Sequence, residues 1–158
     1  MSTSTAAPVA SGEIPQEHVV VRGSASGFLQ EAMAGKHRFA VDEPVNVGGS
    51  GSAPDPYDYL LAALGACTSM TVGWYAREKK IPLEQVSVTL RHSRIHARDC
   101  EQCETKSGTL DRIDLDVQLT GPITSAQQAK LMEIAAKCPV HRTLKSEIDI
   151  RLRPTKTS

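Results

Sequence analysis

Short apolar stretches broken by polar residues recur near the start of the chain, at residues 18–22, 28–33 and 36–41. Segments of this length and composition predict three strands. Glycines within 23–27 and at 35 predict the tight turns between them. The run of glycine and serine at 48–52 predicts a flexible loop rather than a phosphate-binding one, because no Gly-Lys-Ser/Thr pattern follows it.

A long helix is predicted over residues 56–80. Asp55 can cap its start, Pro56 suits the first helical position, and Asp58 places negative charge in the positive first turn. Pro82 disfavours helix just before it and so sets the end. Four residues recur at helical spacing and predict one face: Leu60, Leu64, Cys67 and Thr71. Small residues on this helix, among them Gly65, predict the close approach of another helix.

Two later segments show strict alternation of apolar and polar residues, which predicts a pair of strands. Their apolar positions are Val86, Val88 and Leu90 in the first and Ile113, Leu115, Val117 and Leu119 in the second. Between them lies a charged insertion, residues 92–111, that contains histidine and cysteine.

A second helix and a last strand complete the pattern. Thr124 and Gln127 form a capping box at the start of the helix. Its apolar residues are Leu131, Ile134 and Ala135. The final alternation, at Ile148, Ile150 and Leu152, predicts a strand. Clusters of strands separated by two helices indicate an α+β fold with helices packed on sheet faces.

The chain has 158 residues, enough for one domain with its own core and too few for two ordinary ones. We expect a disordered tail over 1–14 and a single domain over 15–158. Basic and acidic residues number 18 each and aromatic residues make up 4%, so we expect no nucleic-acid partner. No apolar run approaches the roughly 18 residues of a membrane span, and no secretory signal begins the chain. We therefore expect no membrane partner and a cytoplasmic protein, in which cysteines favour reactive or metal-binding roles.

Two cysteines stand far apart in the sequence, Cys67 within the apolar helix and Cys138 just before Pro139. A thiol reacts as the thiolate, so a reactive cysteine needs positive surroundings. Cys67 lies too far from the helix start to gain from its dipole and needs a cation from elsewhere in the fold. Pro139 suits the first position of a short helix, which would place Cys138 at an N-terminus where amide donors stabilise negative charge. The alternative is that both are buried as small hydrophobic residues.

Two segments match a known family: residues 54–71, PDPYDYLLAALGACTSMT, and residues 137–144, KCPVHRTL. With them the sequence resembles the OsmC/Ohr family of thiol-dependent peroxidases over nearly the whole chain after its tail. The resemblance implies an intertwined α+β homodimer. Antiparallel sheets would pack around two long central helices, with an active site at each end of the interface.

The resemblance also implies the chemistry. Cys67 would be the peroxidatic thiol, which attacks an organic hydroperoxide, releases an alcohol and becomes a sulfenic acid. Cys138 would be the resolving thiol, which forms a disulfide with Cys67, and a dithiol reductant would restore both thiols. Such a protein would serve in oxidative stress defence. No motif for haem, flavin or nucleotide is present, so we expect no required cofactor.

Members of the family use an arginine from the N-terminal strands to hold the thiolate, and an acidic residue early in the cysteine helix to orient that arginine. Arg22 and Arg38 are the two candidates for the arginine, and Asp58 is the candidate for the acid. Tyr57 stands where the Ohr branch has glutamate. The pattern is therefore closer to the broader OsmC-like branch, whose members are less uniformly active.

The charged insertion offers a second set of candidate residues. Cys100 and Cys103 form a CxxC, and His96 or His92 would complete a tetrahedral zinc site. A polar hairpin tip with incidental thiols and a redox CxxC are the alternatives. For the whole chain, the alternative to a peroxidase is a non-enzymatic OsmC-like module that holds a small apolar ligand or zinc.

Overall fold

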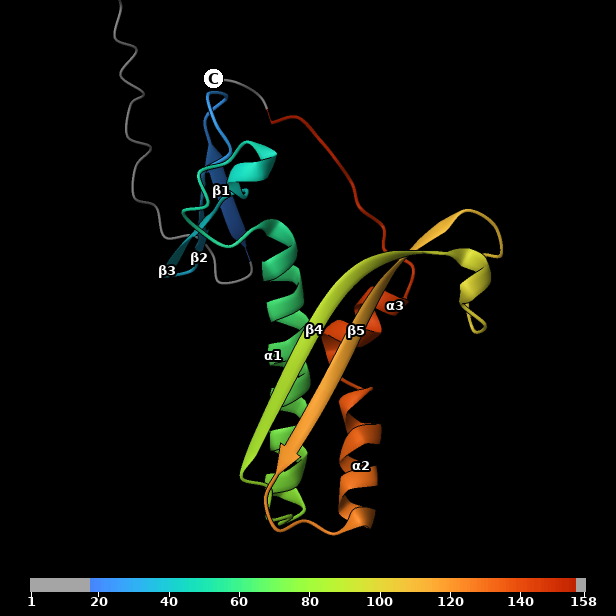
Figure 1. Ribbon diagram of the computed structural model, residues 1–158. Coiled ribbons are helices and arrows are strands. Elements are labelled where there is room, and N and C mark those ends of the chain that lie inside the picture. Colours follow the sequence, from blue (N-terminus) through green and yellow to red (C-terminus); the bar gives the residue numbers. More distant parts are fainter. Residues whose placement is uncertain (1–17, 156–158) are drawn as a thin grey trace, which may run out of the picture. The chain divides into compact units, whose positions relative to one another are not determined.

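The structure, a computed structural model, describes residues 18–155, which form two compact units that divide between Asp58 and Tyr59 (Figure 1). Its elements are helices and antiparallel strands, which confirms the predicted α+β class. The tail predicted over 1–14 lies outside the described residues. The single domain predicted over 15–158 stays a prediction.

The N-terminal unit contains a three-stranded antiparallel sheet in the order β1-β2-β3. Its strands are β1 (Val19–Gly23), β2 (Gln30–Ala34) and β3 (His37–Val41), close to the predicted segments. Gly35 has a φ of +57°, which glycine adopts readily, and it makes the turn between β2 and β3. Ala32 and Met33 of the central strand are buried.

Asp42 organises the loop after β3, which the sequence predicted to be flexible. This loop carries a short 3-10 helix, η1 (Val45–Val47). The buried Asp42 carboxylate accepts hydrogen bonds from the backbone N–H and the hydroxyl of both Ser50 and Ser52, at 2.6–3.2 Å. These donors, with the Ser50 hydroxyl first, hold the pKa of Asp42 well below its ordinary value. An ionised side chain thus ties the glycine- and serine-rich loop to the end of the sheet.

The long helix α1 (Pro56–Glu78) starts where the sequence predicted. The Asp58 N–H donates to Asp55 Oδ1 at 2.9 Å, and the Asp55 N–H donates to Asp58 Oδ2 at 3.1 Å. This reciprocal pair satisfies N–H groups that a helix start leaves without partners. The expected cap is confirmed.

In the C-terminal unit, strands β4 (Gln85–His96) and β5 (Thr109–Thr120) form a long antiparallel hairpin. Val88 lies opposite Val117 in the predicted pair of strands. Both strands extend beyond the predicted segments, so the insertion between them shortens to 97–108 and begins with the 3-10 helix η2 (Ala97–Asp99). Figure 1 shows this hairpin running along α1 and the following helix α2.

Helices α2 (Ser125–Ala135) and α3 (Pro139–Lys145) complete the C-terminal unit. The capping box is confirmed: the Gln127 N–H donates to Thr124 Oγ1, and the Thr124 N–H donates to Gln127 Oε1. α1 and α2 pack together through a core of buried residues. This core consists of Val72, Ala76, Leu131 and Ala135. Half-buried residues of the hairpin, such as Val86 and Leu119, cover it.

The strand predicted at the end of the chain is wrong. Residues 147–155 have no regular secondary structure, and the Ile150 and Leu152 side chains are 85% and 99% exposed. An alternating segment becomes a strand only when a neighbouring strand supplies hydrogen-bond partners. No described strand pairs with this segment.

Candidate thiol site

Cys138 lies at the start of α3, as the sequence predicted, and its side chain acts as the N-cap. Its Sγ accepts a hydrogen bond from the His141 N–H at 3.2 Å. Pro139 occupies the first turn of the helix, where its missing N–H costs nothing. The Cys138 side chain is completely buried.

Thr68 brings Cys138 to the long helix. The Thr68 hydroxyl lies 3.6 Å from Cys138 Sγ and 2.9 Å from the Leu64 carbonyl oxygen. Thr68 directly follows Cys67 in α1, so the buried sulfur packs against the turn of α1 that carries the other thiol. Cys67 and Cys138 are both free thiols.

Cys67 lies at the edge of the buried face of α1 and is half-buried. The predicted face contained Cys67 and Thr71, whereas the residues that are buried recur four apart: Leu64, Thr68, Val72 and Ala76. The predicted face is therefore rotated from the observed one. One thiol of the pair is accessible, and the other is enclosed.

Gly65 allows the hairpin to approach α1 on the same turn. A Cβ at Gly65 would lie 2.6 Å from Leu90 Cδ1, which is too close for van der Waals contact. The close neighbour is a side chain of β4, not the helix that the sequence predicted.

A pocket of about 220 Å³ opens beside these residues. Its walls combine aliphatic side chains from three elements with a few polar groups. They are Leu64, Asp111, Ile113, Leu115, His141, Leu144 and Lys145. Two of these residues lie close to Cys138: the His141 N–H donates to its sulfur, and the Leu64 carbonyl oxygen accepts from the neighbouring Thr68 hydroxyl. The pocket therefore adjoins the buried thiol. An apolar molecule with a polar end would fit its composition.

At the rim, His92 Nε2 lies 2.9 Å from Asp111 Oδ1. This hydrogen bond, with a smaller contribution from Arg94, lowers the pKa of Asp111. The carboxylate therefore stays ionised beside the pocket. The sequence indicated His92 only as a possible zinc ligand, because its partner Asp111 lies 19 residues away.

The arginine and acid candidates belong to the N-terminal unit. Arg22 lies in β1 opposite Glu31, and Arg38 lies in β3 and forms an exposed ion pair with Glu31 at 3.3 Å. Asp58 uses one carboxylate oxygen to cap α1. The roles expected for Arg22, Arg38 and Asp58 stay predictions.

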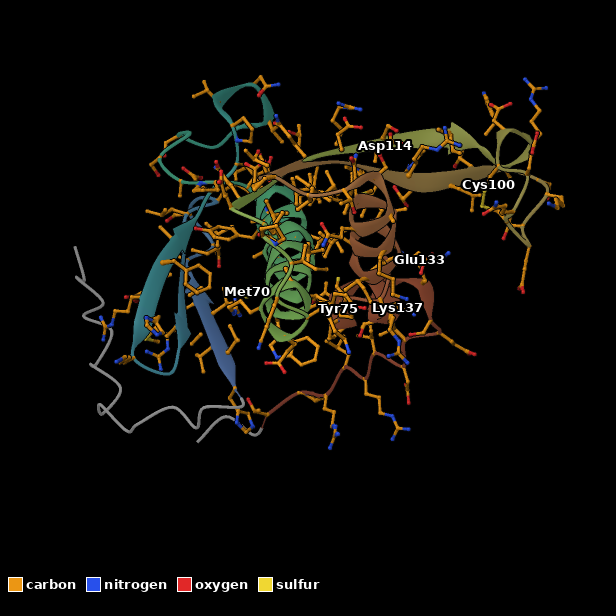
Figure 2. The ribbon with its side chains drawn as sticks, turned by 90° about the horizontal axis from the view of Figure 1, so that it is seen from below. Met70, Tyr75, Cys100, Asp114, Glu133 and Lys137 are labelled. Atoms are coloured by element: carbon orange, nitrogen blue, oxygen red, sulfur yellow. A yellow bond between two sulfur atoms is a disulfide. The ribbon has the colours of Figure 1, made fainter. Side chains whose placement is uncertain are left out.

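Cys100 and Cys103 are joined by a disulfide in the turn between β4 and β5. Figure 2 shows Cys100 at the far end of the hairpin, away from α1 and α2. Sulfurs bonded to each other are not thiolate ligands. Within residues 18–155, no group of three His, Cys, Asp or Glu side chains could hold a metal ion. Zinc binding by His96, Cys100 and Cys103 therefore stays a prediction, and it requires both cysteines as free thiols.

The family model for OsmC-like protein matches residues 49–153. The chain belongs to the OsmC-like family. Among the helices described here, none is long and apolar enough to cross a membrane. A comparison with curated proteins found no match.

Solved structures of this family share the fold. An OsmC organic hydroperoxide resistance protein from Legionella pneumophila is 23% identical, with a TM-score of 0.60, and the match covers 84% of this chain and 90% of that one. An OsmC-like protein from Mycoplasma pneumoniae is 19% identical, with a TM-score of 0.64 and coverage of 81% and 86%. The organic hydroperoxide resistance protein OhrB of Bacillus subtilis is 18% identical, with a TM-score of 0.57 and coverage of 84% and 92%.

Proposed function

We propose that this OsmC-like protein reduces organic hydroperoxides, with Cys67 as the peroxidatic thiol and Cys138 as the resolving thiol. The observation that supports this most is the accessible thiol of α1 next to a residue, Thr68, that touches a second, enclosed thiol. An oxidant from solution meets Cys67 first, because Cys138 is buried. The hydroperoxide resistance proteins among the solved structures support the same role in oxidative stress defence.

The proposed reaction cycle has three steps. The Cys67 thiolate attacks one oxygen of the hydroperoxide; an S–O bond forms, the O–O bond breaks, and the alkoxide takes a proton and leaves as alcohol. The Cys138 thiolate then attacks the sulfenic sulfur; an S–S bond forms and the oxygen leaves as water. A dithiol reductant returns two electrons by exchange and leaves as its own disulfide.

The contacts of Cys138 suit the resolving step. Its sulfur accepts from the His141 N–H at 3.2 Å. The Thr68 hydroxyl lies 3.6 Å away and shares its single proton between this sulfur and the Leu64 carbonyl oxygen. Hydrogen bonds to a sulfur anion stabilise the thiolate, which is the form that attacks. The His141 N–H belongs to α3, so this donor is in place before oxidation.

The Cys67 thiolate needs a nearby cation to stabilise its negative charge. We favour Arg22 over Arg38, because Glu31 already forms an ion pair with Arg38. The Arg22→Gln variant should then lose hydroperoxide turnover, and Arg38→Gln should retain it. The opposite order of the two rates would assign the role to Arg38.

The first test is turnover by the wild-type protein with cumene hydroperoxide and dithiothreitol. Aliphatic walls near the thiols favour an organic tail by about 0.8 kcal/mol per buried methylene. Burial equivalent to about two methylenes should therefore raise kcat/KM roughly tenfold above that for hydrogen peroxide. Hydroperoxide loss and free thiols are followed together. Consumption no faster than with dithiothreitol alone, with both free thiols retained, would contradict the proposal and favour the non-enzymatic binding module.

We also propose that the chain is a homodimer that pairs its long helices. α1 has a second apolar face, opposite its core, made of the exposed residues Ala63, Ala66, Met70 and Trp74. Trp74 is 57% exposed and Met70 is 71% exposed. Exposed apolar surface of this kind marks protein interfaces.

Light scattering should give twice the chain mass of 17.0 kDa for the wild type. The Met70→Glu variant should give the single mass, because a charge would be buried in the interface. The exposed methionine of α2 provides the control, and Met132→Glu should remain dimeric. A wild-type monomer at micromolar concentration would contradict the pairing.

A further inference from the structure

The turn between β4 and β5 contains a pair of cysteines that the peroxidase chemistry does not use. Cys100 and Cys103 are bonded to each other and half-buried, three residues apart in the sequence. A disulfide at the tip of a hairpin either stabilises the turn or takes part in thiol–disulfide exchange. The surroundings of the pair distinguish these roles.

Besides the disulfide, hydrogen bonds also hold the turn. The Ala97 N–H donates to the Gly108 carbonyl at 2.9 Å and closes the base, where Ala97 is fully buried. Arg112 Nη2 donates to the Asp99 carbonyl at 3.4 Å across the turn. A disulfide that closes so short a loop also removes little entropy from the unfolded chain. The disulfide is therefore expected to contribute little to the stability of the folded protein.

A basic pocket of about 270 Å³ lies in the same turn. Its lining residues are His96, Arg98, Lys106, Ser107 and Gly108, with no carboxylate among them. Arg98 precedes Cys100 by two residues. Lys106 Nζ donates to the carbonyl of Glu101, which lies between the two cysteines, at 3.3 Å. Arg98 and Lys106 thus place positive charge within the turn that carries the disulfide, where it attracts an anionic thiol. Three residues that directly flank the two cysteines are acidic: Asp99, Glu101 and Glu104.

We propose that Cys100 and Cys103 form a second redox centre, which exchanges its disulfide with a small thiol that carries a carboxylate bound by Arg98 and Lys106. A thiolate attacks one sulfur, a mixed disulfide forms, and the other cysteine leaves as thiolate and takes a proton. A second thiolate attacks the mixed disulfide and releases the small-molecule disulfide and the second cysteine. Two electrons pass from two small thiols to the protein. This centre does not depend on the proposed peroxidase activity.

The test uses the full chain with Cys67→Ser and Cys138→Ser, so that only one disulfide reacts. Its reduction by 3-mercaptopropionate and by 2-mercaptoethanol is followed by alkylation and intact mass. The ratio of the two rates should fall about fivefold in Arg98→Gln/Lys106→Gln, because a unit charge at contact distance contributes about 1 kcal/mol in water. Comparing each variant with its parent cancels the intrinsic reactivity of the two thiols.

Arg91→Gln/Lys130→Gln removes the same charge from exposed ion pairs elsewhere and provides the control. Its rate ratio should equal that of the parent. An equal fall in both variants, no fall in either, or no reduction of the folded protein by either thiol would overturn the proposal. The Cys100→Ser/Cys103→Ser variant should keep its unfolding temperature. A drop of more than about 5 °C would show a structural staple instead.

Discussion

Replacing Cys67 by serine should abolish the consumption of cumene hydroperoxide. A serine hydroxyl is almost fully protonated at neutral pH and is a far weaker nucleophile than a thiolate. Loss of the attacking group should reduce kcat/KM at least about a thousandfold, which corresponds to roughly 4 kcal/mol of transition-state stabilisation. The substitution is nearly isosteric and the site is only half-buried, so the fold should be retained. The measurement is hydroperoxide loss with dithiothreitol in excess.

The matched control for this variant is the half-buried pair Cys100 and Cys103. Cys100→Ser/Cys103→Ser removes two cysteines from the hairpin turn and should leave hydroperoxide turnover within about twofold of the wild type. Turnover by the Cys67→Ser variant at the wild-type rate would exclude the mechanism proposed for this chain.

Replacing Cys138 by serine should leave the first chemical step intact and block the second. Serine is a good N-cap, and its hydroxyl can accept the hydrogen bond from His141 that Cys138 accepts now. α3 should therefore still form. Without a resolving thiol, one equivalent of hydroperoxide should convert Cys67 to a persistent sulfenic acid.

Dimedone, which labels sulfenic acids, and intact mass give the readout without added reductant. The Cys138→Ser variant should carry close to one dimedone adduct per chain at Cys67, and the wild type close to none. Equal labelling of the two proteins would show that Cys138 does not resolve the intermediate.

The sequence predicted correctly those features of the fold that depend on residues close together in the chain. The cap of α1 at Asp55 and Asp58, the capping box of α2 at Thr124 and Gln127, and the N-terminal position of Cys138 are all local signals. Such caps depend on residues three apart or fewer, so a single sequence contains the whole motif.

The wrong predictions concern features that depend on tertiary packing: the buried face of α1 and the pairing of the last segment. α1 has apolar residues on two sides, so helical spacing alone did not identify the face that is buried with Thr68 and Val72. The alternation at 148–152 matches a strand, but no described strand of this chain pairs with it. Long-range pairing depends on residues that the local pattern does not contain.

Two contacts of the site are equally non-local. The Thr68 hydroxyl reaches Cys138 across 70 residues of sequence, and Asp42 gathers Ser50 and Ser52 around one carboxylate. A polar residue within an apolar helix signals such a contact without naming its partner. The position of Thr68, a polar residue next to Cys67 in an apolar helix, is thus a signal in the sequence from which its contact with a buried partner could have been predicted. The sequence-based prediction missed this contact.

The most direct test of the account is to locate the disulfide that one equivalent of cumene hydroperoxide produces in the wild-type protein. Proteolysis after alkylation, followed by mass spectrometry, identifies the linked peptides. The proposed mechanism predicts a new bond between Cys67 and Cys138, alongside the existing bond between Cys100 and Cys103. If Cys67 and Cys138 both remain alkylated as free thiols while the hydroperoxide is consumed, the account is contradicted.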